Sequence, residues 1–178
     1  ALTFTNTRGN IGTLLADDLS LGTHIGSGWN TLTLTGAQAD MRIVDSLTLA
    51  DGTLAVNDGA TLRTGDHRDA SNTGATIGNY SITTSGIASN IIFDTQGNDA
   101  DSQIYQGTIS GSGNFVRATG GTTVFTTDNS YSGSTTIKQG GILHLGQGGT
   151  TGGINPVSQI IDDGILTVNR SNNVLLNG

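Results

Sequence analysis

The chain is 178 residues long, has 28 glycines, one proline and no cysteine, and carries a formal charge of −7 at pH 7. The lack of cysteine excludes disulfides and thiolate metal sites, and the acidic balance with scattered arginines argues against nucleic-acid binding. All 14 acidic residues are aspartate, which favours turns, while threonine, valine and isoleucine favour strands. The composition therefore predicts an almost pure β protein, and no apolar run is long enough for a transmembrane helix.

Short strands follow one another along the chain, with glycine, asparagine or aspartate between them. Within each strand apolar and polar residues alternate, so the large side chains lie on one face. The predicted strands are residues 2–7, 13–21, 31–35, 46–50, 53–56, 61–63, 75–77, 80–83, 90–93, 103–109, 114–117, 122–126, 134–137, 142–145, 159–161, 166–168 and 174–176. Residues 66–73 and 97–102 are predicted to be protruding loops.

One strand phrase recurs three times, at residues 52–56, 141–145 and 164–168. Each copy is a glycine followed by apolar residues two apart, and the spacing from Gly141 to Gly164 suits one coil of a solenoid. Strands this short, separated by single glycines, favour a coil that turns a corner every few residues over a sandwich. We therefore expect a β-solenoid with about 20–25 residues per coil and a slim core of leucine, isoleucine and valine.

Residues 105–146 carry a more specific pattern. It begins with Gly-x-Gly, continues with Asn-x-Tyr-x-Gly-x-Thr, and ends with Gly-x-Leu-x-Leu. Its positions are Gly111, Gly113, Asn129, Tyr131, Gly133, Thr135, Gly141, Leu143 and Leu145. This pattern resembles the passenger-associated transport repeat of bacterial autotransporters, with Phe115 and Val124 at positions where that repeat usually has leucine.

The resemblance implies a right-handed, single-stranded parallel β-helix, in which residues 1–178 form one segment of a longer secreted passenger. Such passengers leave Gram-negative bacteria by type V secretion, through an outer-membrane translocator barrel that we expect elsewhere in the parent protein. The implied role is virulence-associated adhesion at the cell surface or after secretion. The implied partner is a host cell-surface protein or glycan, or a second passenger. The repeat itself needs no ligand, and Tyr131 is expected to pack beside a corner with its hydroxyl at the surface.

Residues capable of acid–base chemistry do not form a recognisable catalytic pattern. The three histidines, His24, His67 and His144, lack suitable neighbours, and His144 should point outward from its strand. The adjacent aspartate pairs at residues 17–18 and 162–163 should point to opposite faces or serve turns. We therefore predict no catalytic residue and a protein that is not an enzyme. The alternatives are a polysaccharide-acting enzyme with an aspartate ladder, or a purely structural stalk or folding seed.

Two loops and one aromatic residue are candidates for binding. The first loop presents Asp66, His67, Arg68 and Asp69 as a polar tip. The second collects Asp94, Asp99 and Asp101 around glycine, a set of hard oxygen ligands that suits calcium, although a plain acidic loop is the favoured interpretation. No other cofactor is expected. The single tryptophan, Trp29, either anchors a partner or covers the core. The sequence leaves open the ligand, the host, the oligomeric state and any cleavage from the translocator.

Overall fold

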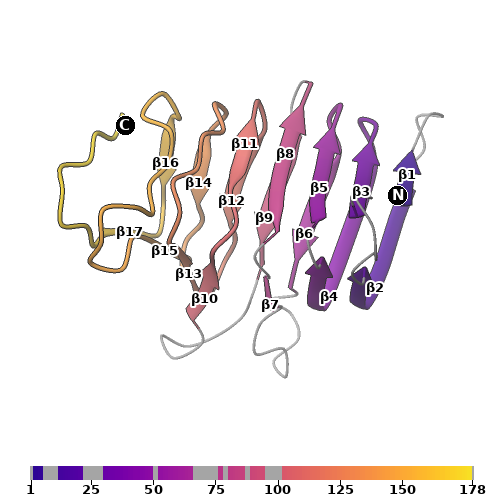
Figure 1. The fold of residues 1–178 in the computed structure, drawn as a ribbon, viewed down its shortest axis with the longest axis horizontal. Helices are drawn as coiled ribbons and strands as arrows, with labels where there is room; N and C mark the ends of the chain where they lie inside the picture. Colours follow the sequence, from indigo (N-terminus) through magenta and orange to yellow (C-terminus); the bar gives the residue numbers. More distant parts are fainter. Residues whose placement is uncertain are drawn as a thin grey trace.

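The structure is a computed structural model that describes residues 2–5, 12–21, 30–49, 52–65, 76–77, 80–86, 89–94 and 102–177. Every regular element within these ranges is a β-strand, and every strand pair is parallel. Strands of one chain that pair only in parallel must be joined by connections that return to the same end, so the backbone winds upward. The fold is a parallel β-solenoid, as the sequence predicts (Figure 1).

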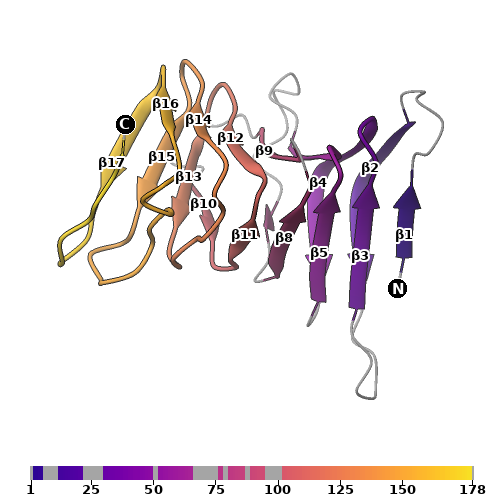
Figure 2. The ribbon, with the colours of Figure 1, turned by 90° about the horizontal axis from the view of Figure 1, so that it is seen from above.

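Three sheets form the sides of the stack (Figure 2). Sheet A contains, in spatial order, β1 (Leu2–Thr5), β3 (Asn30–Thr35), β5 (Gly52–Asn57), β8 (Ser81–Ser85) and β11 (Ile109–Gly111). Sheet B contains β16 (Ile160–Asp162), β14 (Thr135–Ile137), β12 (Asn114–Arg117), β9 (Asn90–Phe93), β6 (Thr61–Thr64), β4 (Ala39–Leu49) and β2 (Gly12–Leu21), with β7 (Thr76–Ile77) paired to β4. Sheet C contains β10 (Ser102–Tyr105), β13 (Thr122–Phe125), β15 (Ile142–Leu145) and β17 (Ile165–Val168).

The strand register gives the length of each coil. In sheet C, Thr122 pairs with Ile142, and Ile142 pairs with Ile165 one coil later. Both spacings lie within the predicted coil length of about 20–25 residues. At the other end of the molecule Leu2 pairs with Leu32, which makes a longer coil. The predicted length therefore describes the C-terminal half, whereas the N-terminal coils include longer ones.

Inward side chains stack in columns because the alternation of each strand is kept from coil to coil. One column in sheet A consists of the buried residues Leu32, Leu54, Ile82 and Ile109. The equivalent column in sheet B consists of Met41, Leu62, Ile91 and Phe115. β6, β9, β12 and β15 each alternate between half-buried and buried residues along their length. These columns are the continuous apolar core of the solenoid.

The C-terminal half of the core is aromatic. Phe93 and Phe115 pack edge to face with ring centroids 5.1 Å apart, and Phe115 lies 4.9 Å from Phe125. Tyr105 and Tyr131 extend the same cluster, at 5.5 Å from Phe93 and 6.2 Å from Phe115. All five rings are fully buried. The C-terminal coils therefore add a cluster of rings to the predicted core of leucine, isoleucine and valine, which continues there with Ile137, Leu143 and Leu145.

Three predicted strands differ from the observed ones by more than two residues at an end. The strand predicted at residues 103–109 is split into β10 and β11 at Gly107, where a Cβ would stand 2.0 Å from the carbonyl oxygen of Tyr80. β4 begins at Ala39 rather than residue 46, because Met41 and Ile43 face inward between polar neighbours. Residues 174–176 are described but do not form a strand. An alternating pattern forms a strand only where a strand of a neighbouring coil pairs with it through backbone hydrogen bonds.

Candidate functional site

Asn129 of the transport-repeat pattern links three consecutive coils. Its Oδ1 accepts a hydrogen bond from the backbone N–H of Ile109 at 2.8 Å. Its Nδ2 donates to the carbonyl oxygens of Thr127 at 3.0 Å and Gly153 at 3.1 Å. The side chain is 3% exposed, so each of these bonds replaces one that water would otherwise supply. Only an amide offers an acceptor and two donors in this shape, which accounts for asparagine at this position.

Tyr131 and Thr135 belong to a buried hydroxyl network. The Tyr131 hydroxyl lies 2.7 Å from Oγ1 of Thr135, which lies 2.9 Å from Oγ of Ser158 in the next coil. Ser158 in turn donates to the carbonyl oxygen of Gly133 at 2.6 Å. The expectation that the Tyr131 hydroxyl reaches the surface is therefore wrong. Thr135 occupies an inward position of β14 and supplies the hydroxyl a partner inside the core.

The glycines of the pattern mark places where two coils approach closely. At Gly111, φ is +99° and a Cβ would stand 1.8 Å from the carbonyl oxygen of Thr84. At Gly133 a Cβ would stand 2.3 Å from the carbonyl oxygen of Gly113. Gly113 and Gly141 face similar contacts, while Leu143 and Leu145 are buried core residues of β15. Each residue of the pattern therefore contributes to stacking the coils.

Arg117 is a fully buried arginine that the sequence analysis did not single out. Its guanidinium donates to the carbonyl oxygens of Phe93, Gly120 and Gly121, and so caps a corner between β12 and β13. Burial lowers the pKa of Arg117 to about 10, and the charge of Asp94 opposes this shift. A signal was present in the sequence, since Arg117 follows Phe115 by two and therefore shares its inward face.

The two predicted binding loops begin at neighbouring positions of sheet B. Asp94 directly follows β9, and its backbone N–H donates to the carbonyl oxygen of Thr64. Thr64 is followed by Gly65, the last residue that the structure describes before the first predicted loop. The Asp94 carboxylate is fully buried and accepts a hydrogen bond from Nη1 of Arg63 at 2.7 Å, with Nη2 of Arg42 at 3.9 Å. Arg63 therefore already neutralises Asp94, one of the three predicted calcium ligands. Its other members, Asp99 and Asp101, and the loop residues Asp66, His67, Arg68 and Asp69 lie outside the described residues.

The remaining acid–base candidates serve local structure where they are described. His144 is half-buried and points outward between the inward Leu143 and Leu145, as predicted. Oδ1 of Asp162 accepts a hydrogen bond from the backbone N–H of Gly164 in the turn between β16 and β17. The side chains at residues 17–18, and His24 and Trp29, lie outside the described part. Among the residues that are described, no three of the histidine, aspartate and glutamate side chains gather as a metal site would require.

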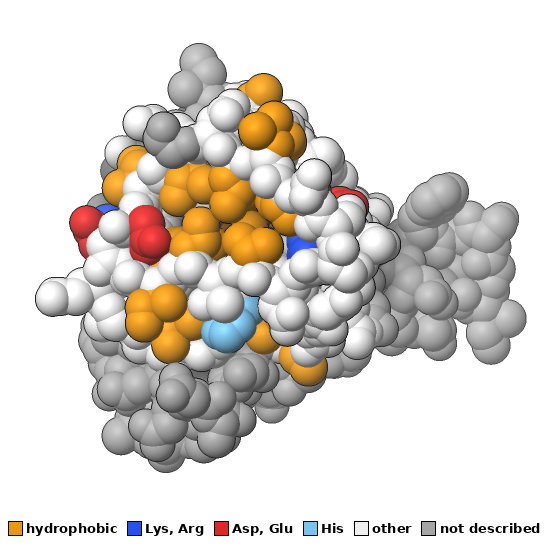
Figure 3. Space-filling view, turned by 90° about the vertical axis from the view of Figure 1, so that its left-hand side faces the viewer, with side chains coloured by type: hydrophobic (Ala, Val, Ile, Leu, Met, Phe, Trp, Pro, Cys, Tyr) orange, Lys and Arg blue, Asp and Glu red, His pale blue; other side chains and the backbone are white. Residues whose placement is uncertain are grey.

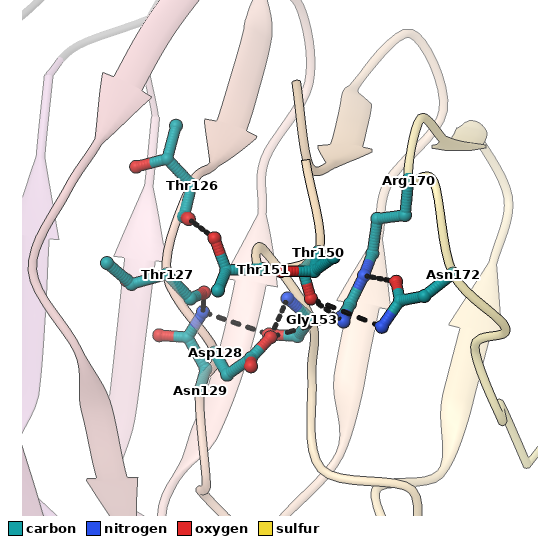
Figure 4. Close-up of polar contacts among 9 residues, drawn as sticks. All are labelled: Thr126, Thr127, Asp128, Asn129, Thr150, Thr151, Gly153, Arg170 and Asn172. Atoms are coloured by element: carbon teal, nitrogen blue, oxygen red, sulfur yellow. Dashed lines mark hydrogen bonds and ion pairs between the residues drawn. The ribbon is translucent and has the colours of Figure 1, made fainter. Parts of the chain in front are cut away.

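A pocket of about 430 Å³ lies near the C-terminal end of the stack. Its walls come from three segments of consecutive coils, and its lining residues are Asp128, Asn129, Ser130, Gly153, Ile154, Asn155, Pro156, Arg170, Asn173, Val174 and Leu175. Oδ1 of Asp128 accepts from the backbone N–H of Gly153 at 2.9 Å and from Nη1 of Arg170 at 3.1 Å (Figure 4). Arg170 also donates to Oδ1 of Asn172 and to the carbonyl oxygen of Thr150. We call this the Asp128–Arg170 pocket.

The same end of the molecule exposes apolar side chains (Figure 3). Ile161 of β16 is 43% exposed, and Ile165 and Val168 of β17 are 54% and 44% exposed. Leu175, which also lines the pocket, is 68% exposed. The sequence analysis did not predict the pocket, because its walls are brought together only by the stacking of coils.

Comparison with known proteins does not identify a family or a function for this chain. No protein-family model matches the sequence, and no curated protein or solved structure matches it either. The described part of the chain also contains no helix that could cross a membrane.

Proposed function

We propose that this chain is a non-catalytic segment of an autotransporter passenger, exported through the outer membrane of a Gram-negative bacterium. In this proposal its β-solenoid presents a surface that contacts a host cell-surface protein or glycan. The observation that carries the proposal is that residues of the repeat pattern join neighbouring coils. Asn129, Tyr131, Gly133 and Thr135 all make contacts between stacked coils, in the case of Tyr131 through its ring against Phe115. This is what a transport-repeat pattern would be expected to do in a passenger that folds by adding coils.

Three of the described carboxylates have structural partners, which supports a non-catalytic role. A glycosidase needs two carboxylates facing one another across the scissile bond, about 5–9.5 Å apart. Asp94 is instead paired with Arg63, Asp128 with Arg170, and Asp162 with a turn N–H. Each of these carboxylates has a structural partner, and the three carboxylates lie in different parts of the stack. The side chains that remain on the outer faces, mainly threonine, serine and asparagine, suit distributed contact with a partner.

Surface display tests both parts of the proposal. The chain is fused to an autotransporter translocator barrel, and export is measured by protease digestion of intact cells. Adhesion is measured as retention of these cells on cultured epithelial cells, with the same barrel carrying an unrelated passenger as the control. We expect the chain to reach the surface and to raise retention several-fold above the control.

Three results would contradict the proposal, each in a different way. Retention of the chain in the periplasm would contradict the secretion route. Export with no gain in adhesion would favour the stalk over the adhesin. New reducing or unsaturated ends released from acidic polysaccharides by the purified chain would identify an enzyme instead.

A further inference from the structure

The Asp128–Arg170 pocket has the chemistry of a small polar binding site. Its volume of about 430 Å³ lies within the range of ordinary ligand pockets. It combines polar groups, from Asp128, Ser130 and Asn173, with aliphatic groups, from Ile154 and Val174. Such a combination binds a ligand that has both hydrogen-bonding groups and an apolar face.

The charge of the pocket selects against anionic ligands. Asp128 and Arg170 are the two charged residues in its lining, and they are paired with each other at 3.1 Å. Arg170 is held by three acceptors, on Asp128, Thr150 and Asn172, and its side chain is only 10% exposed. The guanidinium is therefore oriented toward the protein and compensated, so a phosphate, sulfate or carboxylate would find no uncompensated cation.

The Asp128 carboxylate keeps one oxygen available to a ligand. Oδ1 receives both recorded hydrogen bonds, while Oδ2 has none from the residues that the structure describes. The side chain is 60% exposed, so Oδ2 can accept hydrogen bonds from outside the protein. A carboxylate oxygen in one pocket with the hydroxyl of Ser130 and the amide of Asn173 offers acceptors and donors to adjacent hydroxyl groups.

From these features we infer that the Asp128–Arg170 pocket binds a neutral sugar unit of a glycan. The sugar hydroxyls hydrogen-bond to Asp128 Oδ2, Ser130 and Asn173, and its C–H face packs on Ile154 and Val174. None of the described residues that line the pocket is aromatic, so they offer no ring that would stack on a nucleobase. The inference rests on the proposed adhesive function, since it names the class of ligand that such an adhesin would recognise.

The test uses the purified chain and a panel of immobilised oligosaccharides, neutral, sialylated and sulfated. Affinities for the best neutral oligosaccharide are then measured by calorimetry. We expect neutral oligosaccharides to bind. Asp128→Asn should weaken binding at least tenfold, about 1.4 kcal/mol, because it removes a charge-assisted hydrogen bond. Asn173→Ala should weaken binding about threefold and leave the fold intact, since its side chain is exposed and makes no hydrogen bond to another described residue.

The matched control is Asp163→Asn, which removes the same charge from an exposed turn outside the pocket and should leave affinity unchanged. Melting temperatures of all three variants separate lost binding from lost folding. The inference is overturned if no neutral oligosaccharide binds, if acidic ones bind better, or if Asn173→Ala and Asp128→Asn both bind like the unaltered chain.

This experiment and the display experiment can fail separately. Cell adhesion without glycan binding would overturn the pocket and leave the adhesin proposal standing. Glycan binding by a chain that is not exported would support the pocket and contradict the secretion route.

Discussion

The two halves of this solenoid stack their coils in the same direction but stabilise them differently. Between residues 30 and 64 the inward side chains are mostly aliphatic, as at Leu34 and Val56. Corners there combine backbone bonds with exposed side-chain bonds such as the one from Thr35 Oγ1 to Asp58 Oδ2. Between residues 102 and 168 the core contains a cluster of aromatic rings, and corners are tied by buried side chains such as Asn129 and Arg117. Parallel stacking therefore tolerates two kinds of core, provided that each corner has its polar backbone groups satisfied.

Coil length does not separate the two halves in this way. The coil from Leu54 to its partner Ile82 in sheet A is longer than the coil from Thr122 to Ile142 in sheet C. The coil from Leu32 to Leu54, however, is shorter than the coil from Ile142 to Ile165. In a solenoid each coil contacts only its neighbours, so the two halves should respond separately to mutation.

The largest effect is expected from Phe115→Ala. Phe115 contacts the rings of Phe93, Phe125 and Tyr131, and its truncation should lower the free energy of unfolding by about 3–5 kcal/mol. The paired variant in the other half is Leu54→Ala, with an expected cost of about 2–5 kcal/mol. Hydrogen exchange measured by mass spectrometry should show lost protection mainly in residues 102–168 for the first variant and mainly in residues 30–64 for the second. Equal loss in both halves for both variants would mean that the solenoid unfolds as one unit.

Alkaline pH should produce the next largest loss of stability, mainly in the aromatic half, which holds two of the three tyrosines. Burial raises the pKa of Tyr80, Tyr105 and Tyr131 above the usual value of 10, so these phenols stay protonated in the folded state while they ionise in the unfolded state. Their contribution is complete below pH 10 and falls above it by about 1.4 kcal/mol per tyrosine and pH unit. Arg117 acts in the opposite sense, since its pKa of about 10 when folded lies below the usual 12.5. The net loss above pH 10 is thus about 3 kcal/mol per pH unit.

Tyrosine absorbance at 295 nm checks this directly, because the chain has only these three tyrosines. We expect ionisation to coincide with unfolding followed by circular dichroism. An independent ionisation step near pH 10 in the folded protein would contradict the burial of at least one hydroxyl.

The smallest effect is expected from Asn129→Ala. It leaves the N–H of Ile109 without its partner and removes a donor from Gly153 C=O, at a cost of about 2 kcal/mol. The control is Asn57→Ala, a half-buried asparagine on the outer face of β5, which should cost less than about 0.5 kcal/mol. Denaturant unfolding measures both. Similar values for the two variants would show that the bridge between coils adds nothing beyond an ordinary surface asparagine.

The alternation of apolar and polar residues predicted the strands well where one face was clearly apolar and the other clearly polar. β9, β12 and β15 have the predicted boundaries, since inward apolar residues such as Ile91 and Phe93 alternate with half-buried ones. The start of β4 was missed because its outward positions hold charged Asp40 and Arg42. The repeat pattern was found as sequence, yet the reason for its asparagine and threonine became clear only from the neighbouring coils.

The parallel solenoid is already encoded in the order of the residues, because a period of two and corner glycines act within a few positions of the chain. Which polar groups lie inside depends on the folded molecule, since the Tyr131 hydroxyl and the Arg117 guanidinium find their partners on other turns or coils. Stacking also creates the Asp128–Arg170 pocket, whose two charged residues are far apart in the sequence. Register between coils sets these contacts, and register depends on the length of every intervening loop rather than on any local pattern.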